Sequence, residues 1–188
     1  MHRYLSIFLI LLLLLVSCED EAQRRKFSKS LLKIIEQLAR NNQKKEPLQF
    51  KKGEEYLIKV VRIADGDSFT GLTEDKMEIS CRIYGIDAPE NQQPFSNRSK
   101  QTLIGLISNK QVRIKIRDID QYRRAVVQVY TEDEKDISAE MLRAGMAWHY
   151  KQYSKEKEYA ELEKEARQQK IGLWADKNPI EPWEWRRR

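Results

Sequence analysis

The sequence predicts an α+β fold that is mainly β, a five-stranded barrel of the OB type with three helices. Two observations lead to this prediction. Five short strand-like segments, four of them rich in Val and Ile and some alternating apolar with charged residues, follow one another from residue 56 to residue 130. One helical stretch separates the third segment from the fourth, and two more follow the fifth. Five short strands with a single interposed helix are typical of an OB-type barrel.

The strands are recognised by the period of their apolar residues. The first segment ends at Asp65-Gly66, a pair that favours a hairpin turn. Two later segments place apolar side chains at every second position, as expected of half-buried strands. These positions are Val112, Ile114 and Ile116 in one segment and Ala125, Val127 and Val129 in the other. The five strands are expected at residues 56–64, 68–72, 78–86, 112–117 and 125–130.

The three helices are predicted by helical spacing and by residues that favour helix ends. The interposed helix begins at Ser96. Its apolar face consists of Leu103, Leu106 and Ile107. The two closing helices are expected at residues 138–144 and 155–169, with Ser154 as the N-cap of the second. Gly172 follows that helix as a stop signal.

The first residues of the chain have the pattern of an export signal. Residues 4–16 are almost wholly apolar, but they are fewer than the roughly 20 that a membrane-spanning helix needs. The run ends in Leu15-Val16-Ser17-Cys18, which resembles a bacterial lipobox. We therefore expect a lipoprotein signal peptide at residues 1–17, lipid on Cys18, and a protein anchored by that lipid in the bacterial cell envelope. The alternatives are an uncleaved anchor helix and an ordinary signal with an incidental cysteine.

Residues 18–50 are predicted to form a basic amphipathic arm and linker ahead of the main domain at residues 51–188. Basic residues open the arm, and apolar residues then recur at helical spacing. The apolar positions are Phe27, Leu31, Ile34, Ile35 and Leu38. Such a helix lies on an anionic membrane, pairs with another helix, packs against the barrel or serves as a spacer, and the sequence leaves these alternatives open.

Charge and cysteine content limit the classes of partner and of stabilisation. The net charge of +6 favours anionic partners such as nucleic acid or anionic lipid, although many basic proteins bind neither. Once Cys18 carries lipid, Cys81 is the only other cysteine, so no disulfide can form within the mature chain. The fold must therefore be stabilised by a packed core.

Three short motifs carry the residues that chemistry needs. Asp67 and Asp87 stand at the ends of adjacent predicted strands, and two carboxylates with a backbone carbonyl and waters make a plausible calcium site. Arg82 and Arg124 can bind phosphate oxygens through a bidentate fork. Glu90 can take a proton from a water molecule. Each residue alone also fits a plain turn or a surface charge, but the motifs occur together and in order.

These motifs together resemble the staphylococcal nuclease family. The matching stretches are 61–69 around Asp-Gly-Asp-Ser, 82–90, 122–124, 142–147, Gly172-Leu173-Trp174 and Pro182-Trp183-Glu184-Trp185. The resemblance covers residues 54–185. It implies a calcium-dependent enzyme that acts as a monomer, cuts DNA and RNA with little sequence preference, and leaves 3′-phosphate ends.

The resemblance also implies a role for individual residues. Asp67, Asp87 and the carbonyl of Ala88 would be calcium ligands, and Glu90 would be the general base or would orient the attacking water. Arg82 and Arg124 would hold the scissile phosphate. Tyr122 and Tyr150 would flank the nucleotide. OB-type barrels that bind single strands through basic grooves and aromatic stacking are tolerant of sequence in the same way.

The chain departs from the family at two positions, and two other functions compete with catalysis. Arg123 stands where the family usually has Gly, and a positive φ there would strain the loop that presents Arg124. Trp148 stands where Tyr is common, and its ring can pack in the same place. The main alternative function is a nucleic-acid-binding module of the same family that no longer cuts. A more distant one is an envelope interaction protein that works through the arm.

Overall fold

The computed structural model describes residues 26, 29–34 and 50–188. The chain divides into two units, Met1–Gln49 and Phe50–Arg188. In the first unit the described residues, 26 and 29–34, are helical. The signal peptide, Cys18 and the rest of the arm lie outside the described residues. Among the residues that the structure describes, no helix has the length and apolar character needed to cross a membrane.

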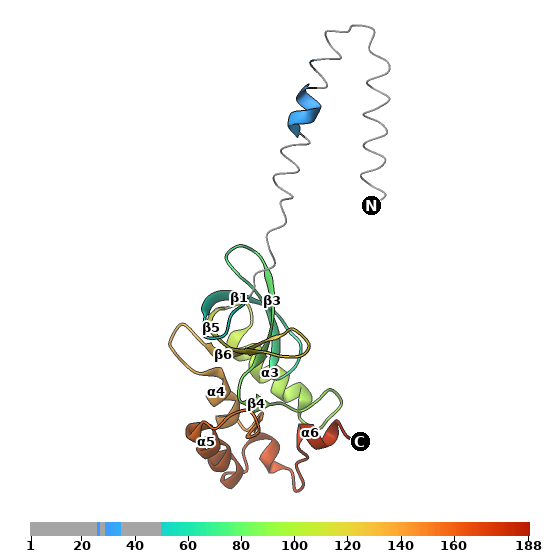
Figure 1. Cartoon of the computed structure of the whole chain (residues 1–188). Helices are drawn as coiled ribbons and strands as arrows, with labels where there is room; N and C mark the ends of the chain where they lie inside the picture. Colours follow the sequence, from blue (N-terminus) through green and yellow to red (C-terminus); the bar gives the residue numbers. More distant parts are fainter. Residues whose placement is uncertain (1–25, 27–28, 35–49) are drawn as a thin grey trace. The chain divides into compact units, whose positions relative to one another are not determined.

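The second unit is built around a closed five-stranded barrel (Figure 1). Its strands are β1 (Glu55–Ile63), β2 (Ser68–Leu72), β3 (Glu78–Ile83), β5 (Gln111–Ile119) and β6 (Ala125–Tyr130). They close in the order β1-β2-β3-β6-β5. All neighbours are antiparallel except β3 and β6, which pair in parallel. The predicted α+β fold with a five-stranded OB-type barrel is confirmed.

The barrel closes because each strand turns one row of apolar side chains inward. In β5 and β6 the buried side chains occupy alternate positions, as the sequence predicts. β3 does the same with Ile79, Cys81 and Ile83. These rows pack against Ile58 and Val60 of β1 and form a single core. Cys81 is buried within it as a free thiol.

The third strand is shorter than predicted, and its early end matters for the site. A single strand over 78–86 is wrong, because the chain turns after Ile83 and resumes as β4 (Ile86–Asp87). Gly85 at the turn has a φ of 80°, and a Cβ there would lie 2.7 Å from Cε2 of Tyr159. β4 then pairs with β7 (Trp148–His149) outside the barrel. The turn therefore delivers Asp87 into a small second sheet.

The turn between β1 and β2 is tight for a different reason from the one predicted. A hairpin of the Asp-Gly type needs positive φ, but neither Asp65 nor Gly66 is among the positive-φ residues. Instead, a Cβ at Gly66 would lie 1.9 Å from Oγ of Ser99 on α3 (Ser96–Ile107). Glycine is required here because the turn lies against a helix.

The three predicted helices are present, with small shifts at their ends. α3 is as predicted at its start, α4 spans Ile137–Arg143 and α5 spans Lys157–Gln168. α4 is capped by Asp136, whose side chain accepts a hydrogen bond from the Ser138 N–H. Ser154 is not the N-cap of α5, since Glu156 occupies that position. A 3₁₀ turn (Gly172–Ala175) and a short helix α6 (Pro182–Trp185) complete the fold, and α4 and α5 lie together beside the barrel (Figure 1).

We predict that Gly85→Ala lowers the free energy of unfolding by about 1–3 kcal/mol, because it combines a positive φ with the contact to Tyr159. Gly105→Ala is the matched control. Gly105 lies on α3 with no atom near its missing Cβ, so alanine there should stabilise the protein by about 0.5–1 kcal/mol. Urea unfolding of both variants checks the prediction. Equal effects of the two substitutions would contradict it.

Candidate active site

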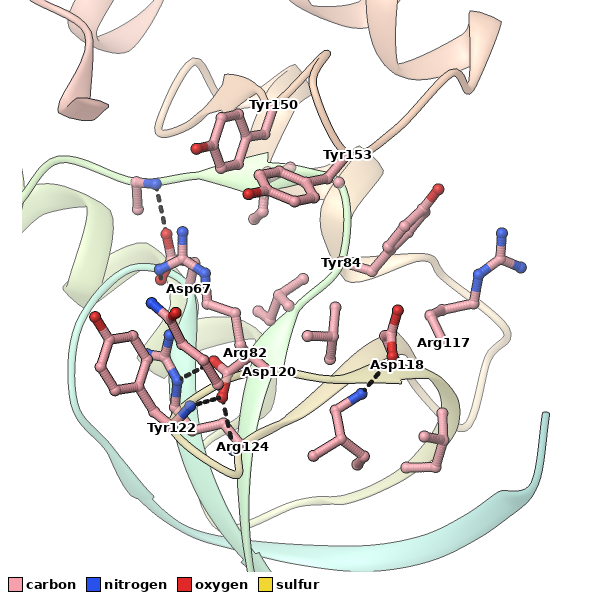
Figure 2. Close-up of a pocket in the computed structure, with 18 of the residues that line it drawn as sticks. Asp67, Arg82, Tyr84, Arg117, Asp118, Asp120, Tyr122, Arg124, Tyr150 and Tyr153 are labelled. Carbon is pink, nitrogen blue, oxygen red and sulfur yellow. Dashed lines mark hydrogen bonds and ion pairs between the residues drawn. The ribbon is translucent and has the colours of Figure 1, made fainter. Parts of the chain in front are cut away.

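One cavity of about 920 Å³ gathers most of the predicted site residues (Figure 2). It is bordered by the turn between β1 and β2, the end of β3, the loop after β4, the second half of β5 with the loop before β6, and the segment after β7. The predicted site residues among its lining are Asp67, Arg82, Ala88, Glu90, Tyr122, Arg124 and Tyr150. Asp87 is fully buried beneath the lining and reaches it through its ion pairs. The fold therefore brings together residues that lie up to 83 positions apart in the sequence (150 minus 67).

Arg82 holds two buried carboxylates at the floor of this cavity. One terminal nitrogen of its guanidinium donates to Oδ1 of Asp67, and the other donates to Oδ1 of Asp87. The side chains of Asp67 and Asp87 are 2% and 0% exposed. Buried charges of one sign need such a partner, because water does not reach them. The two predicted cation ligands and one predicted phosphate-binding arginine thus form a single cluster.

Asp67 is held by further hydrogen bonds. The Ala88 N–H donates to its Oδ2 at 2.6 Å, and the Ser68 hydroxyl donates to its Oδ1 at 3.1 Å. Burial raises the pKa of Asp67 to about 8, because desolvation and the nearby carboxylates outweigh the attraction of Arg82. Additional positive charge at this position would favour the ionised carboxylate. The cluster is therefore electrostatically suited to a cation.

Glu90 lies at the rim with its side chain 35% exposed. Its backbone N–H donates to Oε1 of Gln93 at 2.9 Å. Its carboxylate accepts a hydrogen bond from Arg186, which follows α6. The carboxylate therefore has a fixed partner while it remains accessible from the cavity.

Arg124 is presented by a turn that Asp120 organises. Oδ1 of Asp120 accepts hydrogen bonds from the N–H groups of Tyr122 and Arg124, both at 2.9 Å. Its Oδ2 pairs with Nε of Arg124 at 2.7 Å. Although desolvation acts in the opposite direction, these bonds lower the pKa of Asp120. Arg123 has a φ of 63°, as expected of a position where the family has Gly, and the turn carries that strain.

The two predicted tyrosines differ in environment. Tyr122 is 71% exposed at the edge of the cavity, and the Arg124 guanidinium lies 5.5 Å from the centroid of its ring. Tyr150 is stacked on Trp183 with 5.3 Å between centroids and 4° between ring planes. Tyr153 meets Tyr150 edge to face at 4.8 Å, and the two lie side by side in Figure 2. Tyr122, Tyr150 and Tyr153 all line the same cavity as Arg82.

Three residues that hold the site residues in place were given no role by the sequence analysis. Asp120 could have been found as an acidic residue four positions before Arg124 at a predicted turn, where a side chain commonly bonds the backbone. Gln93 and Arg186 gave no such signal, because their partners are set by the tertiary fold. Arg186 lies 99 positions after Asp87 in the sequence.

The donor set fits a hard cation, although the residues present supply only part of a coordination shell. Within the described part of the chain, no group of three or more His, Cys, Asp or Glu side chains is arranged to hold a metal ion. Asp67 and Asp87 contribute two carboxylates that contact one guanidinium. Calcium accepts oxygen ligands from carboxylates, backbone carbonyls and waters together, so two carboxylates are sufficient as the charged part of a site.

A five-stranded barrel with this cluster at one end defines a nuclease-type OB domain, and comparison with known proteins agrees. Residues 80–176 match the family described as staphylococcal nuclease homologue. The chain belongs to this family. Asp67 and Arg186 lie outside the matched stretch, on either side of it.

Several bacterial relatives are similar over most of their length. An uncharacterized endonuclease of Haemophilus influenzae is 45% identical over 134 residues, which are 71% of this chain and 75% of the relative. A micrococcal nuclease of Shigella flexneri is 40% identical over 138 residues, covering 68% of this chain and 79% of that protein. An uncharacterized endonuclease of Escherichia coli O157:H7 is 38% identical over 130 residues, with coverage of 69% and 84%.

We predict that Arg82→Gln lowers the free energy of unfolding by about 3–5 kcal/mol above the pKa of Asp67, because it removes the guanidinium that the two buried carboxylates share. The control is Arg113→Gln, whose partners Glu55 and Glu134 lie on the surface, and its cost should be below about 1 kcal/mol. Chemical denaturation without added metal measures both.

The loss of stability caused by Arg82→Gln should also grow as the pH rises. The folded state binds a proton at Asp67 up to about pH 8, well above the ordinary range of an aspartate, so stability falls as pH rises through that window. Without Arg82, the ionised form of Asp67 destabilises the folded state further. A deficit that is equal at about pH 6 and about pH 9 would contradict this account of the cluster.

Proposed function

We propose that the chain is a calcium-dependent phosphodiesterase that hydrolyses DNA and RNA with little sequence specificity and leaves 3′-phosphate ends. The observation that carries this proposal is the buried pair Asp67 and Asp87, joined by Arg82 at the floor of a cavity that Glu90 and Arg124 also line. Membership of the staphylococcal nuclease homologue family supports it.

The proposed calcium ligands are Asp67, Asp87 and the carbonyl of Ala88. One guanidinium contacts both carboxylates, so the two lie close enough for one cation to contact both. The Ala88 N–H bond to Asp67 places the backbone of residue 88 beside the first carboxylate. When bound, calcium would supply positive charge against the phosphate oxygens and a site for water. The flexible, oxygen-only set favours the larger cation over magnesium.

The arginines supply the remaining positive charge. Arg82 lies on β3 and Arg124 lies just ahead of its parallel neighbour β6, and both present a planar guanidinium to the cavity. In the proposed reaction a phosphate oxygen replaces a carboxylate as the acceptor of some of their N–H groups. Since the negative charge on these oxygens grows toward the transition state, the arginines would bind it more strongly than they bind substrate.

Glu90 is the proposed general base. It takes a proton from the attacking water, whose oxygen forms a bond to phosphorus while the bond from phosphorus to the 5′ oxygen breaks. The 5′ oxygen takes a proton from solvent water and leaves as a hydroxyl, so the phosphate remains on the 3′ side. The carboxylate is exposed enough for this role and has a fixed orientation through Arg186.

Tolerance of substrate sequence follows from the kind of groups that border the cavity. Tyr122, Tyr150 and Tyr153 offer aromatic surfaces, and every nucleobase has a face that can stack on them. The charged groups contact phosphate, which is common to DNA and RNA. A non-catalytic nucleic-acid-binding module is the alternative function. Such a module needs the aromatic groups and the arginines, but it has no use for Glu90 beside two buried carboxylates.

We also propose that the protein is exported and held in the bacterial cell envelope by lipid on Cys18. The apolar run at residues 4–16 and the lipobox-like end support this proposal. The lipid would attach the chain at one point, and the basic arm at residues 18–50 would add attraction to anionic headgroups. The substrates reached from that position would be extracytoplasmic nucleic acids.

We predict that purified protein hydrolyses plasmid DNA and RNA in calcium, and that the rate falls sharply in magnesium alone. The physical reason is that magnesium demands a small octahedral shell that two carboxylates and a carbonyl do not enforce. Product ends labelled with and without phosphatase treatment identify the 3′-phosphate. Undiminished cleavage in excess chelator would refute the calcium assignment.

Glu90→Gln separates the enzyme from the binding module. Its rate should fall by about 10²–10³ while its melting temperature and its binding of single-stranded DNA stay near those of the wild type. Glu140→Gln is the matched control, since Glu140 is also partly exposed and paired with an arginine, but on α4 away from the cavity. Equal activity of the two variants would favour the binding module.

For the anchor, we predict that Cys18→Ser leaves either an uncleaved precursor or protein that is released from membranes. The reason is that the thiol of Cys18 is the only attachment point for the lipid in the proposed lipobox. Membrane fractionation and mass spectrometry of the mature N-terminus measure the outcome. A mature N-terminus without lipid in the wild type would show the anchor proposal to be wrong.

A further inference from the structure

The chain's last residues lie against the candidate active site. Three contacts hold the C-terminal segment there. Oε1 of Gln93 accepts from the Glu90 N–H at 2.9 Å, while Nε2 of the same Gln93 donates to the carbonyl of Ile180 at 2.6 Å. Trp183 is stacked on Tyr150. Arg186 then contacts both Asp87 and Glu90.

The Arg186 contacts reach into the buried part of the cluster. Its Nη2 donates to Oδ2 of Asp87 at 2.8 Å, and its Nη1 donates to Oδ1 of Asp87 at 3.3 Å and to Oε1 of Glu90. Asp87 is 0% exposed and Arg186 is 39% exposed. A pair with one fully buried partner is different from a surface ion pair, because removing the arginine leaves a buried charge with less compensation.

Gln93 links Glu90 to the C-terminal segment. Its side chain is only 4% exposed, and its two ends bind the backbone of Glu90 and the backbone of the C-terminal segment. The backbone of Glu90 is thus tied to the segment that carries Arg186, and the Glu90 carboxylate is tied to Arg186 itself. A glutamate has several rotatable bonds, so fixing both its backbone and its carboxylate restricts it to one orientation.

We propose that Arg186 is a positioning residue of the active site, which fixes the carboxylate of Glu90 beside Asp87. This inference rests on the proposed function, in which Glu90 is the base. Arg186 lies beyond residues 80–176, the stretch that matches the family, and directly after the helix α6 that brings it to the site. A base held in one orientation is already placed for proton transfer, and misplacement by about 1 Å can cost roughly 10²-fold in rate.

The test compares Arg186→Ala, Arg186→Lys and Arg187→Ala in the full-length protein. Arg187 is the matched control, because it pairs with Glu184 on the surface and does not line the cavity. With a single-stranded DNA oligonucleotide and saturating calcium, Arg186→Ala should lower kcat roughly 10- to 100-fold and leave KM within about threefold. Arg186→Lys should recover only part of the loss, since an ammonium cannot bridge two carboxylates in a fork.

Two further measurements separate positioning from a general effect on folding. Methylguanidinium added at millimolar concentration should raise the rate of Arg186→Ala and leave that of Glu90→Gln unchanged. Hydrogen exchange at the Glu90 amide should be at least about tenfold faster in Arg186→Ala than in the wild type or in Arg187→Ala. This second measurement does not depend on catalysis.

The outcomes are distinguishable. A wild-type kcat in Arg186→Ala, a change in KM alone, or a higher kcat that marks the segment as an obstruction would each overturn the positioning role while leaving the proposed function intact. If the wild type itself cuts nothing, the proposed function fails. In that case unchanged exchange at Glu90 overturns the positioning role as well, and faster exchange in Arg186→Ala supports it.

Discussion

The structure of this site depends on one guanidinium placed between two buried carboxylates. Arg82 is on β3, Asp67 immediately precedes β2 and Asp87 is on β4, so their ion pairs join three strands at one end of the barrel. Two like charges without water would repel one another and drive proton uptake. Arg82 offsets part of this repulsion, and the remaining excess of carboxylate oxygens makes the place attractive to a cation.

The strand pairing of the barrel brings these residues together. The β2–β3 pairing sets Ser68 opposite Arg82, so Asp67 lies one residue before the position that pairs with Arg82. The parallel β3–β6 pairing sets Arg82 opposite Val126 and places Arg124 just ahead of that pair. Gly85 turns the chain out of the barrel and allows Asp87 to follow within five residues of Arg82. Each charged group is therefore held by backbone pairing as well as by its own contacts.

Sequence reasoning predicted most of this arrangement, and the reasons for its failures are physical. The period of apolar residues predicted the five barrel strands, because burial on one face leaves a direct mark on the sequence. It did not predict the break after Ile83, since the residues on both sides are equally apolar and the turn depends on the contact between Gly85 and Tyr159. The role of Gly66 was misread as a turn preference, although the contact with Ser99 on a distant helix explains it.

The site was predictable to the extent that its residues lie in short motifs. Asp67, Arg82, Asp87 and Glu90 come from two motifs, and the structure gathers them around one cavity. Arg186 contacts Asp87 and Glu90, and Gln93 contacts Ile180, across long stretches of sequence, so neither spacing nor composition marks these contacts. The strain at Arg123 was anticipated from the family resemblance, because Arg stands where the family usually has Gly and a positive φ is costly for a residue with a Cβ.

The central claim is that Asp67 and Asp87 form one cation-binding cluster with Arg82. Isothermal titration calorimetry with calcium on the wild type, Asp67→Asn and Asp87→Asn tests it most directly. The account predicts one calcium ion per wild-type chain, and affinity at least about tenfold weaker in each variant, because each substitution removes a charged ligand. Wild-type affinity in either variant would contradict the claim.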